Sequence, residues 1–112
     1  MTAVSPPARG DIVWIQFNPQ AGHEQAGQRP ALVVSPASFN ARSELALLCP
    51  ITSRRRGHRY ETPLPVGLEI TGVVLCHHVK SLDWRSRGAR FVCRAPDEIV
   101  RDVIAKIKTL LD

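Results

Sequence analysis

The sequence predicts a small, mainly β domain: a barrel or half-barrel of short strands capped by a C-terminal helix. Two observations carry this prediction. Short runs rich in β-branched, aromatic and other apolar residues recur between Gly and Pro breaks as far as residue 93. After Pro96 the apolar residues change to a spacing of three and four, which is the period of an amphipathic helix. A series of strands followed by one helix buries its apolar faces by packing the helix on the sheet.

The expected elements follow one another along the chain. We expect strands over residues 11–17, 31–35, 45–51, 62–66, 73–79 and 89–93, and one helical turn over 37–42. Pro50 favours an edge strand or a bulge for the third strand, because proline cannot donate a ladder hydrogen bond. Pro96 suits the first position of the final helix. We expect residues 1–9 to form a flexible arm before a single domain of residues 10–112.

Composition indicates the kind of partner. The 112 residues include 15 Lys or Arg and 10 Asp or Glu, for a formal charge of +5, and 12 of the 15 basic residues are Arg. Guanidinium is planar and binds phosphate with two donors, so this bias favours a partner that carries phosphate. No apolar run approaches the roughly 20 residues of a membrane span, and the N-terminal residues have neither a signal-peptide nor a transit-peptide pattern. We therefore expect a soluble, cytoplasmic protein that does not bind membranes.

Cysteine and histidine do not favour a metal centre. Cys49, Cys76 and Cys93 each lie in an apolar run without a close C-x-x-C pair, so we expect buried free thiols in strands. His77 and His78 are neighbours on an expected strand, and their side chains should point to opposite faces, one inward and one outward. No further ligand is spaced to complete a tetrahedral set. We expect no metal and no cofactor.

The segment over residues 23–30 is the most unusual in the chain. It combines an imidazole, a carboxylate, two carboxamides and a guanidinium directly before a buried strand. Arg29 stands at the start of that strand, where a rigid element would hold it. The alternative is a solvated hairpin loop.

A second candidate segment follows the third strand. Thr52 ends the strand, and its hydroxyl is either a functional group or a local backbone partner. Four arginines then fall within six residues, and no acid lies between Leu45 and Tyr60. This run is either a solvated surface or, as the choice of arginine favours, a phosphate-binding loop. These arginines are Arg54, Arg55, Arg56 and Arg59.

The segment of residues 80–88 combines basic residues with an aromatic ring. Trp84 could stack on an unpaired base, as aromatic side chains do in RNA-binding proteins. Alternatively, Trp84 packs beneath the barrel while its neighbouring arginines lie in solvent.

Three sequence segments together resemble the MazF/PemK family of toxin–antitoxin endoribonucleases. They are RGDIVW at residues 9–14, GHEQAGQRPALVVSP at 22–36 and VKSLDWRSRG at 79–88. The resemblance implies a small SH3-like barrel that works as a homodimer. It implies metal-independent, sequence-specific cleavage of single-stranded RNA such as mRNA, in which the 2′-OH attacks phosphorus to leave a 2′,3′-cyclic phosphate and a 5′-OH. It also implies inhibition by a cognate antitoxin whose acidic tail occupies the RNA groove.

The resemblance also implies roles for individual residues. Arg29 matches the catalytic arginine, which would stabilise charge on the reacting phosphate. Thr52 matches an active-site hydroxyl, and Glu24 matches a loop carboxylate that has been considered as the general base. Many relatives carry Asp-Gln where this chain has His77 and His78. A histidine there could take over proton transfer, or it could contact a base and set the recognised sequence.

The RNA-binding surface is expected to gather polar and basic residues from all three segments: His23, Gln28, Ser53, Arg54, Arg55, Arg56, Lys80, Trp84 and Arg85. Two other functions compete with RNA cleavage. One is a non-catalytic nucleic-acid-binding barrel, and the other is a protein-targeting toxin such as the gyrase poison CcdB. The joint presence of Glu24, Arg29 and Thr52 favours cleavage, because neither alternative needs that set.

Overall fold

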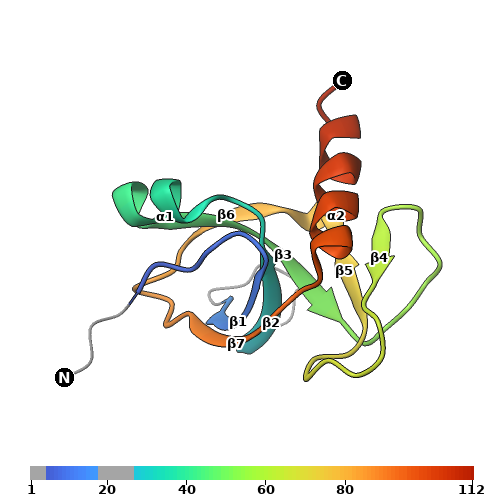
Figure 1. Cartoon of the computed structure of the whole chain (residues 1–112), viewed down its shortest axis with the longest axis horizontal. Coiled ribbons are helices and arrows are strands. Elements are labelled where there is room, and N and C mark those ends of the chain that lie inside the picture. Colours follow the sequence, from blue (N-terminus) through green and yellow to red (C-terminus); the bar gives the residue numbers. More distant parts are fainter. Residues whose placement is uncertain (1–4, 18–26) are drawn as a thin grey trace.

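The computed structural model describes residues 5–17 and 27–112, which form a curved antiparallel sheet with a helix at each side (Figure 1). The strands are β1 (Asp11–Gln16), β2 (Gln28–Val33), β3 (Leu45–Thr52), β4 (Glu61–Pro63), β5 (Val73–Leu75), β6 (Lys80–Asp83) and β7 (Arg90–Arg94). The helices are α1 (Ala37–Ser43), the 3-10 turn η1 (Cys76–His78) and α2 (Asp97–Thr109). Within the described residues, no helix is both long enough and apolar enough to cross a membrane.

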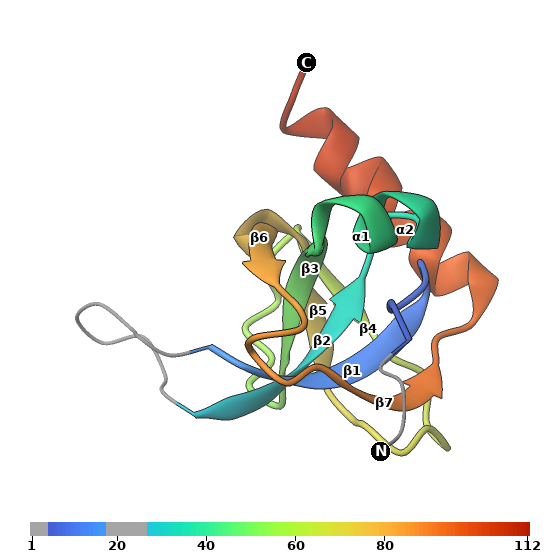
Figure 2. The same ribbon diagram turned by 90° about the vertical axis from the view of Figure 1, so that its left-hand side faces the viewer.

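The sheet divides at β3, its central strand. Along one edge β3 pairs with β2, which continues to β1 and β7. Along its other edge β3 pairs first with β6, over residues 45–48, and then with β5, over residues 51–52. Figure 2 shows the resulting curvature, with β6 and β5 leaving β3 in different directions. This division gives the sheet two ends, one carrying α1 and the other carrying β4 beside α2.

The expectation of an edge strand or bulge at Pro50 is wrong. Pro50 pairs with Ala31 of β2 inside the sheet. On the opposite edge, pairing with β6 ends at Leu48 and pairing with β5 begins at Ile51. The proline therefore falls in the gap between two partner strands, where a missing N–H costs no ladder hydrogen bond.

Two further differences concern the segment from residue 73 to residue 83. The expected strand of residues 73–79 ends at Leu75, and η1 then carries both histidines on its exposed surface rather than on opposite faces of a strand. The strand β6 was not expected, because only Leu82 of its four residues is buried. A strand with so little apolar content gives no clear alternation in the sequence.

The central strands bury both of their faces. Ile12 and Leu32 pack beneath α2 with Ile51 and Val103. Their neighbours on the other face pack in a second cluster that includes Val33, Leu48 and Trp84. Strands that are covered on both sides lose the alternation of apolar and polar residues. This explains the continuous apolar runs in the sequence.

The three cysteines are free thiols, as expected, but the expectation that all are buried in strands holds only for Cys49. Cys49 in β3 and Cys76 in η1 are buried, whereas Cys93 in β7 is half-buried. Burial, with a smaller contribution from Cys76, raises the pKa of Cys49 to about 12. These buried thiols are protonated at neutral pH and therefore poor nucleophiles.

Residues 5–9 lie against the domain. The Asn40 amide donates to the Pro7 carbonyl at 2.7 Å, and the Arg9 guanidinium donates to the Val34 carbonyl at 2.7 Å. One of these bonds comes from a side chain of the domain, Asn40, and the other from the side chain of Arg9 to the backbone of the domain.

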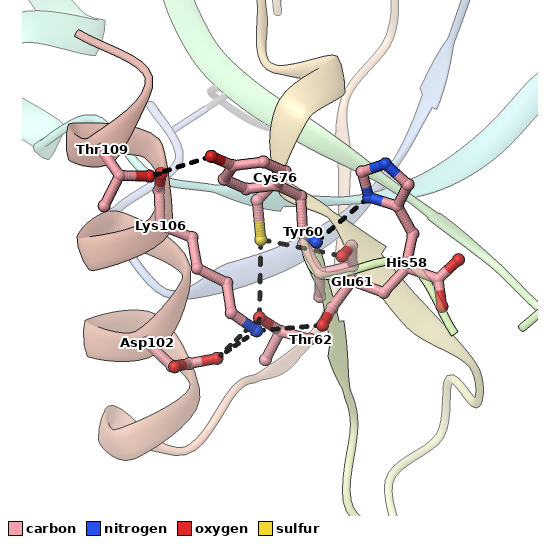
Figure 3. Close-up of polar contacts among 9 residues, drawn as sticks. His58, Tyr60, Glu61, Thr62, Cys76, Asp102, Lys106 and Thr109 are labelled. Atoms are coloured by element: carbon pink, nitrogen blue, oxygen red, sulfur yellow. Dashed lines mark hydrogen bonds and ion pairs between the residues drawn. The ribbon is translucent and has the colours of Figure 1, made fainter. Parts of the chain in front are cut away.

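Helix α2 is attached to β4 by a polar network (Figure 3). The Thr62 hydroxyl, which is buried, donates to Asp102 at 2.7 Å and accepts from the Lys106 ammonium at 3.0 Å. Lys106 also donates to the Glu61 carbonyl at 3.0 Å and pairs with Asp102 at 3.0 Å. The network fixes the helix on the strand that follows the loop of residues 53–59.

Candidate functional site

The site begins where β2 and β3 run side by side. Ala31 pairs with Pro50, and continuing this register places Arg29 of β2 opposite Thr52 of β3. Both side chains are half-buried. Burial lowers the pKa of Arg29, which still leaves the guanidinium charged at neutral pH. Reduced contact with water also strengthens its field on a bound anion.

Two hollows meet at this pair. The larger has a volume of about 860 Å³ and the smaller about 440 Å³. Arg29, Thr52 and Arg54 line both of them. A chain-like ligand that crosses from one hollow to the other therefore passes over all three side chains.

A close backbone approach holds Thr52 in this position. Gly72 has φ of +123°, and a Cβ there would collide with the backbone carbonyl of Thr52. The Thr52 hydroxyl accepts a hydrogen bond from the Arg54 N–H at 3.2 Å, so the local backbone role considered for it is real. The same hydroxyl keeps its own proton for donation to a ligand.

The arginine-rich loop, residues 53–59, is organised by a buried carboxylate. Glu61 is 8% exposed and accepts from the backbone N–H of Arg56 at 3.1 Å and that of Gly57 at 3.1 Å. These bonds use the backbone of the loop and leave its guanidinium groups exposed. The loop therefore presents its charges from a fixed backbone.

Three imidazoles form one wall of the larger hollow. His58, from the arginine-rich loop, stacks on His77 of η1 with a centroid distance of 4.5 Å and an angle of 13°. His78 meets His77 edge-on at 4.4 Å. Desolvation, followed by repulsion from His78 and His58, lowers the pKa of His77. His77 is therefore neutral at pH 7.

The structure brings most of the predicted site residues to these two hollows. Those that line the larger hollow are Arg29, Thr52, Arg54, Arg56, Lys80 and His77. Gln28 and Ser53 line the smaller one. Arg55 lies on the same loop but lines neither hollow, and Arg85 lies beyond β6, with its guanidinium 3.9 Å from Glu44. His23 and Glu24 lie outside the described residues.

The prediction that Trp84 offers a stacking face is wrong. Its side chain is 1% exposed, and its indole N–H donates to the Asn40 carbonyl at 2.8 Å. A ring buried in this way cannot receive a base. Trp84 instead packs in the core, which was the alternative interpretation.

Some lining residues were not among the predicted site residues. Glu61 and His58 belong to the larger hollow, and Glu69 belongs to the smaller one. A signal for Glu61 was available, since it is the first acid after the long acid-free segment that ends at Tyr60. Nothing in the sequence pairs His58 with His77. In the described part of the chain, no three His, Cys, Asp or Glu side chains gather as metal ligands.

Comparison with known proteins agrees with this architecture. Residues 8–111 match the model of a family described as the PemK-like, MazF-like toxins of type II toxin–antitoxin systems. The endoribonuclease toxin MazF of Escherichia coli K12 is 40% identical over 105 residues, which cover 94% of each chain. The Escherichia coli endoribonuclease PemK is 37% identical over 107 residues, covering 92% of this chain and 80% of PemK. The crystal structure of MazF from Deinococcus radiodurans matches with a TM-score of 0.91 and 48% identity, over 96% of this chain and 98% of that one.

The fold, the basic hollows and these likenesses together define a small toxin of the toxin–antitoxin class. More particularly, the chain belongs to the PemK-like, MazF-like toxins of type II toxin–antitoxin systems. The predicted family and the predicted fold class, mainly β with a C-terminal helix, are confirmed. The relatives are named endoribonucleases, in agreement with the predicted enzyme class.

Proposed function

We propose that this toxin is an endoribonuclease that cleaves single-stranded RNA at short sequences without a metal ion. The placement of Arg29 opposite Thr52, where two hollows meet, is the observation that carries the proposal. A nucleic-acid-binding barrel without catalysis would need neither a half-buried guanidinium nor a hydroxyl at the junction.

The chemistry is an internal attack on phosphorus. The ribose 2′-oxygen forms a bond to phosphorus while the bond from phosphorus to the 5′-oxygen breaks, which gives a 2′,3′-cyclic phosphate and a 5′-OH. Arg29 stabilises the negative charge that builds on the non-bridging oxygens. The Thr52 hydroxyl donates a hydrogen bond to one of those oxygens and orients the phosphate.

Two protons must move in this reaction: one leaves the 2′-OH, and one reaches the 5′-oxygen. His77 can accept the first, because its neutral imidazole borders the larger hollow that Arg29 also lines. Glu24 is the other candidate for this step. Arg29 is positioned to supply the proton to the leaving oxygen or to stabilise the charge there.

The RNA backbone would follow the basic side chains of the hollows. Arg54, Arg56 and Lys80 line the larger hollow. They would hold phosphates on one side of the cleaved bond, and Gln28 with Ser53 would hold the strand on the other side. The same basic surface is suited to the acidic tail of a cognate antitoxin. The solved MazE–MazF complexes from Deinococcus radiodurans show a relative with its antitoxin partner.

We also propose a homodimer that works in the cytoplasm. Leu45 and Leu47 of β3 are 38% and 39% exposed, and Phe91 of β7 is 59% exposed. Apolar side chains of this size on a small domain favour burial against a second copy. Analytical ultracentrifugation of the purified protein tests this assembly directly.

Incubation of the protein with a long single-stranded RNA in EDTA tests the central proposal. We expect fragments that begin with a 5′-OH and end with a cyclic phosphate, at a small set of sequences. A need for divalent metal, or intact RNA after prolonged incubation, would contradict the proposal. Inhibition of DNA gyrase by a protein that leaves RNA intact would instead favour the protein-targeting alternative.

A further inference from the structure

The imidazole cluster in the larger hollow has a geometry that neither the proton transfer nor the base contact considered for His77 and His78 has used. Three of the four histidines in the chain gather there, from two separate segments. His58 and His77 lie nearly parallel with their centroids 4.5 Å apart, which is the geometry of stacked aromatic rings.

The backbone on both sides of this pair is fixed. Glu61 pairs with Leu75 in the β4–β5 ladder, and the Cys76 N–H donates to the Tyr60 carbonyl at 3.0 Å. The His58 Nδ1 atom accepts from the Tyr60 N–H at 3.1 Å, which sets the orientation of that ring. Figure 3 shows His58 beside Tyr60 at the start of β4. The stack is therefore held in place before any ligand arrives.

The pair remains accessible although its backbone is held. Both imidazoles are exposed and line the hollow that also contains Arg29 and Thr52. In contrast, Trp84 is buried in the second apolar cluster and lines neither hollow.

His77 carries little charge at neutral pH. His77 is held neutral by desolvation and by its two histidine neighbours, and Glu61 opposes this effect weakly. A neutral ring presents a π face that any base can stack on. The other charged or titratable groups around the hollow are Tyr60, Arg29, Arg54, Arg56 and Lys80. Four of these are cations, which supply the attraction for phosphate.

We propose that the His58–His77 pair is an aromatic wall on which one unpaired RNA base stacks inside the larger hollow. This inference rests on the proposed function, because it takes single-stranded RNA as the ligand. The base extends the stack of two imidazoles, while the neighbouring arginines bind the phosphates on either side of its nucleotide. The pair thereby fixes the position of one base relative to the phosphodiester bond that is cut beside Arg29 and Thr52.

Binding measurements with two probes at pH 7 test this proposal. The first probe is a single-stranded oligonucleotide pool with 2′-O-methyl riboses, which cannot be cleaved because the attacking hydroxyl is blocked. The second is inorganic polyphosphate of similar length, which carries charge but no base. His77→Ala should weaken oligonucleotide binding by about 5- to 150-fold, the range of one base–aromatic stack. It should leave polyphosphate binding unchanged.

The matched variant is His77→Phe, which keeps an aromatic ring and removes the nitrogen atoms. Stacking predicts that it restores oligonucleotide binding to within about threefold of the unaltered protein, since a phenyl face also stacks on bases. His58→Ala should likewise weaken oligonucleotide binding, and His58→Phe should restore it, because His58 is the other ring of the pair. Thermal melting of each variant establishes that it is folded.

Three outcomes would overturn the proposal: His77→Phe as weak as His77→Ala, an equal loss of polyphosphate binding, or no binding of the oligonucleotide by the unaltered protein. The first two would assign the imidazoles to proton or charge contacts. Cleavage in EDTA is measured separately, so the two proposals can fail independently. If the protein cleaves RNA but His77→Phe does not restore oligonucleotide binding, only the proposal of the aromatic wall is contradicted. If His77→Phe restores binding but the protein does not cleave RNA, only the proposal of the nuclease is contradicted.

Discussion

At the scale of single residues, Arg29 combines a positive charge with partial burial and a place in a strand rather than at a loop tip. A strand residue has fewer accessible orientations than a loop residue, so its donors are aimed before the substrate arrives. Residues with this combination of charge and restraint contribute more to a reaction than to the stability of a fold.

Arg29→Ala should lower the rate of RNA cleavage by roughly 100- to 1000-fold, the usual loss for a donor to a developing oxyanion. Arg29→Lys serves as the matched control, because it keeps the charge but loses the planar fork, and it should recover only part of the rate. Single-turnover cleavage of one RNA, alongside melting curves, measures both effects. An unchanged rate in a folded Arg29→Ala protein would remove this residue from the mechanism.

At the scale of elements, the arginine-rich loop and helix α2 are joined through β4. Glu61 binds the loop backbone through its carboxylate, and its own carbonyl accepts from Lys106 of the helix. Thr62, the next residue, bonds to Asp102. Two adjacent residues of one short strand therefore fix the loop on one side and the helix on the other.

Replacing Arg54, Arg55 and Arg56 by Gln should weaken RNA binding and flatten its dependence on salt. Each phosphate contact to single-stranded RNA contributes a slope of about 0.7 in the logarithmic plot of affinity against salt concentration. The matched control changes the net charge equally at exposed positions that line neither hollow: Arg42, Arg90 and Arg101 to Gln. If the two triple variants have equal salt-dependence slopes, the loop is a solvated surface and does not bind phosphate.

Thr62→Val should lower the free energy of unfolding by about 1–3 kcal/mol, since a buried hydroxyl with two charged partners is lost. Thr62→Ser keeps the hydroxyl and should cost less. Urea unfolding measures both variants.

The effect of Thr62→Val should depend on pH. The Thr62 hydrogen bond is the main cause that holds the pKa of Asp102 below its ordinary value. A carboxyl whose pKa is depressed in the folded state stabilises the protein above its unfolded pKa, and this contribution is lost as the pH falls through the folded pKa. The difference between Thr62→Val and the unaltered protein should therefore be larger at pH 6 than at pH 3. A constant difference would show that Asp102 does not carry the effect.

At the scale of the whole molecule, Arg29, Arg54, Arg56 and Lys80 bring positive charge to the two hollows. We expect a peptide of glutamates to compete with RNA for this surface, as a model of an acidic antitoxin tail. A peptide of glutamines with equal length is the control and should not compete. Inhibition of RNA binding should weaken as salt rises and should be smaller in the triple variant of the arginine-rich loop. Equal inhibition by the two peptides would contradict an electrostatic origin.

The sequence predicted those elements whose apolar pattern is complete. Helix α2 was clear from its unbroken spacing, and β1 from its dense β-branched and aromatic residues. The strand β6 was missed because its residues are mostly polar and only one is buried. Trp84 could not be placed, because an amphipathic ring beside arginines is equally compatible with a buried and an exposed position.

Several residues that line the two hollows were predicted as site residues, but their arrangement was not predicted. Arg29 and Thr52 were recognised singly, but their meeting depends on the β2–β3 register, which pairs Ala31 with Pro50. The contact between His58 and His77 depends on β4 pairing with β5. Pairings between segments far apart in the chain are decided by packing of the whole sheet, which no local pattern encodes.

The junction of the two hollows at Arg29 and Thr52 has a consequence for product release. With the proposed site, an uncut RNA strand that crosses the junction would be held in both hollows at once, and each half would raise the effective concentration of the other. Cleavage at the junction would end this linkage and leave one new end in each hollow. The two fragments would then dissociate separately, each with only its own share of the contacts. The geometry that retains the substrate would thus let the products leave.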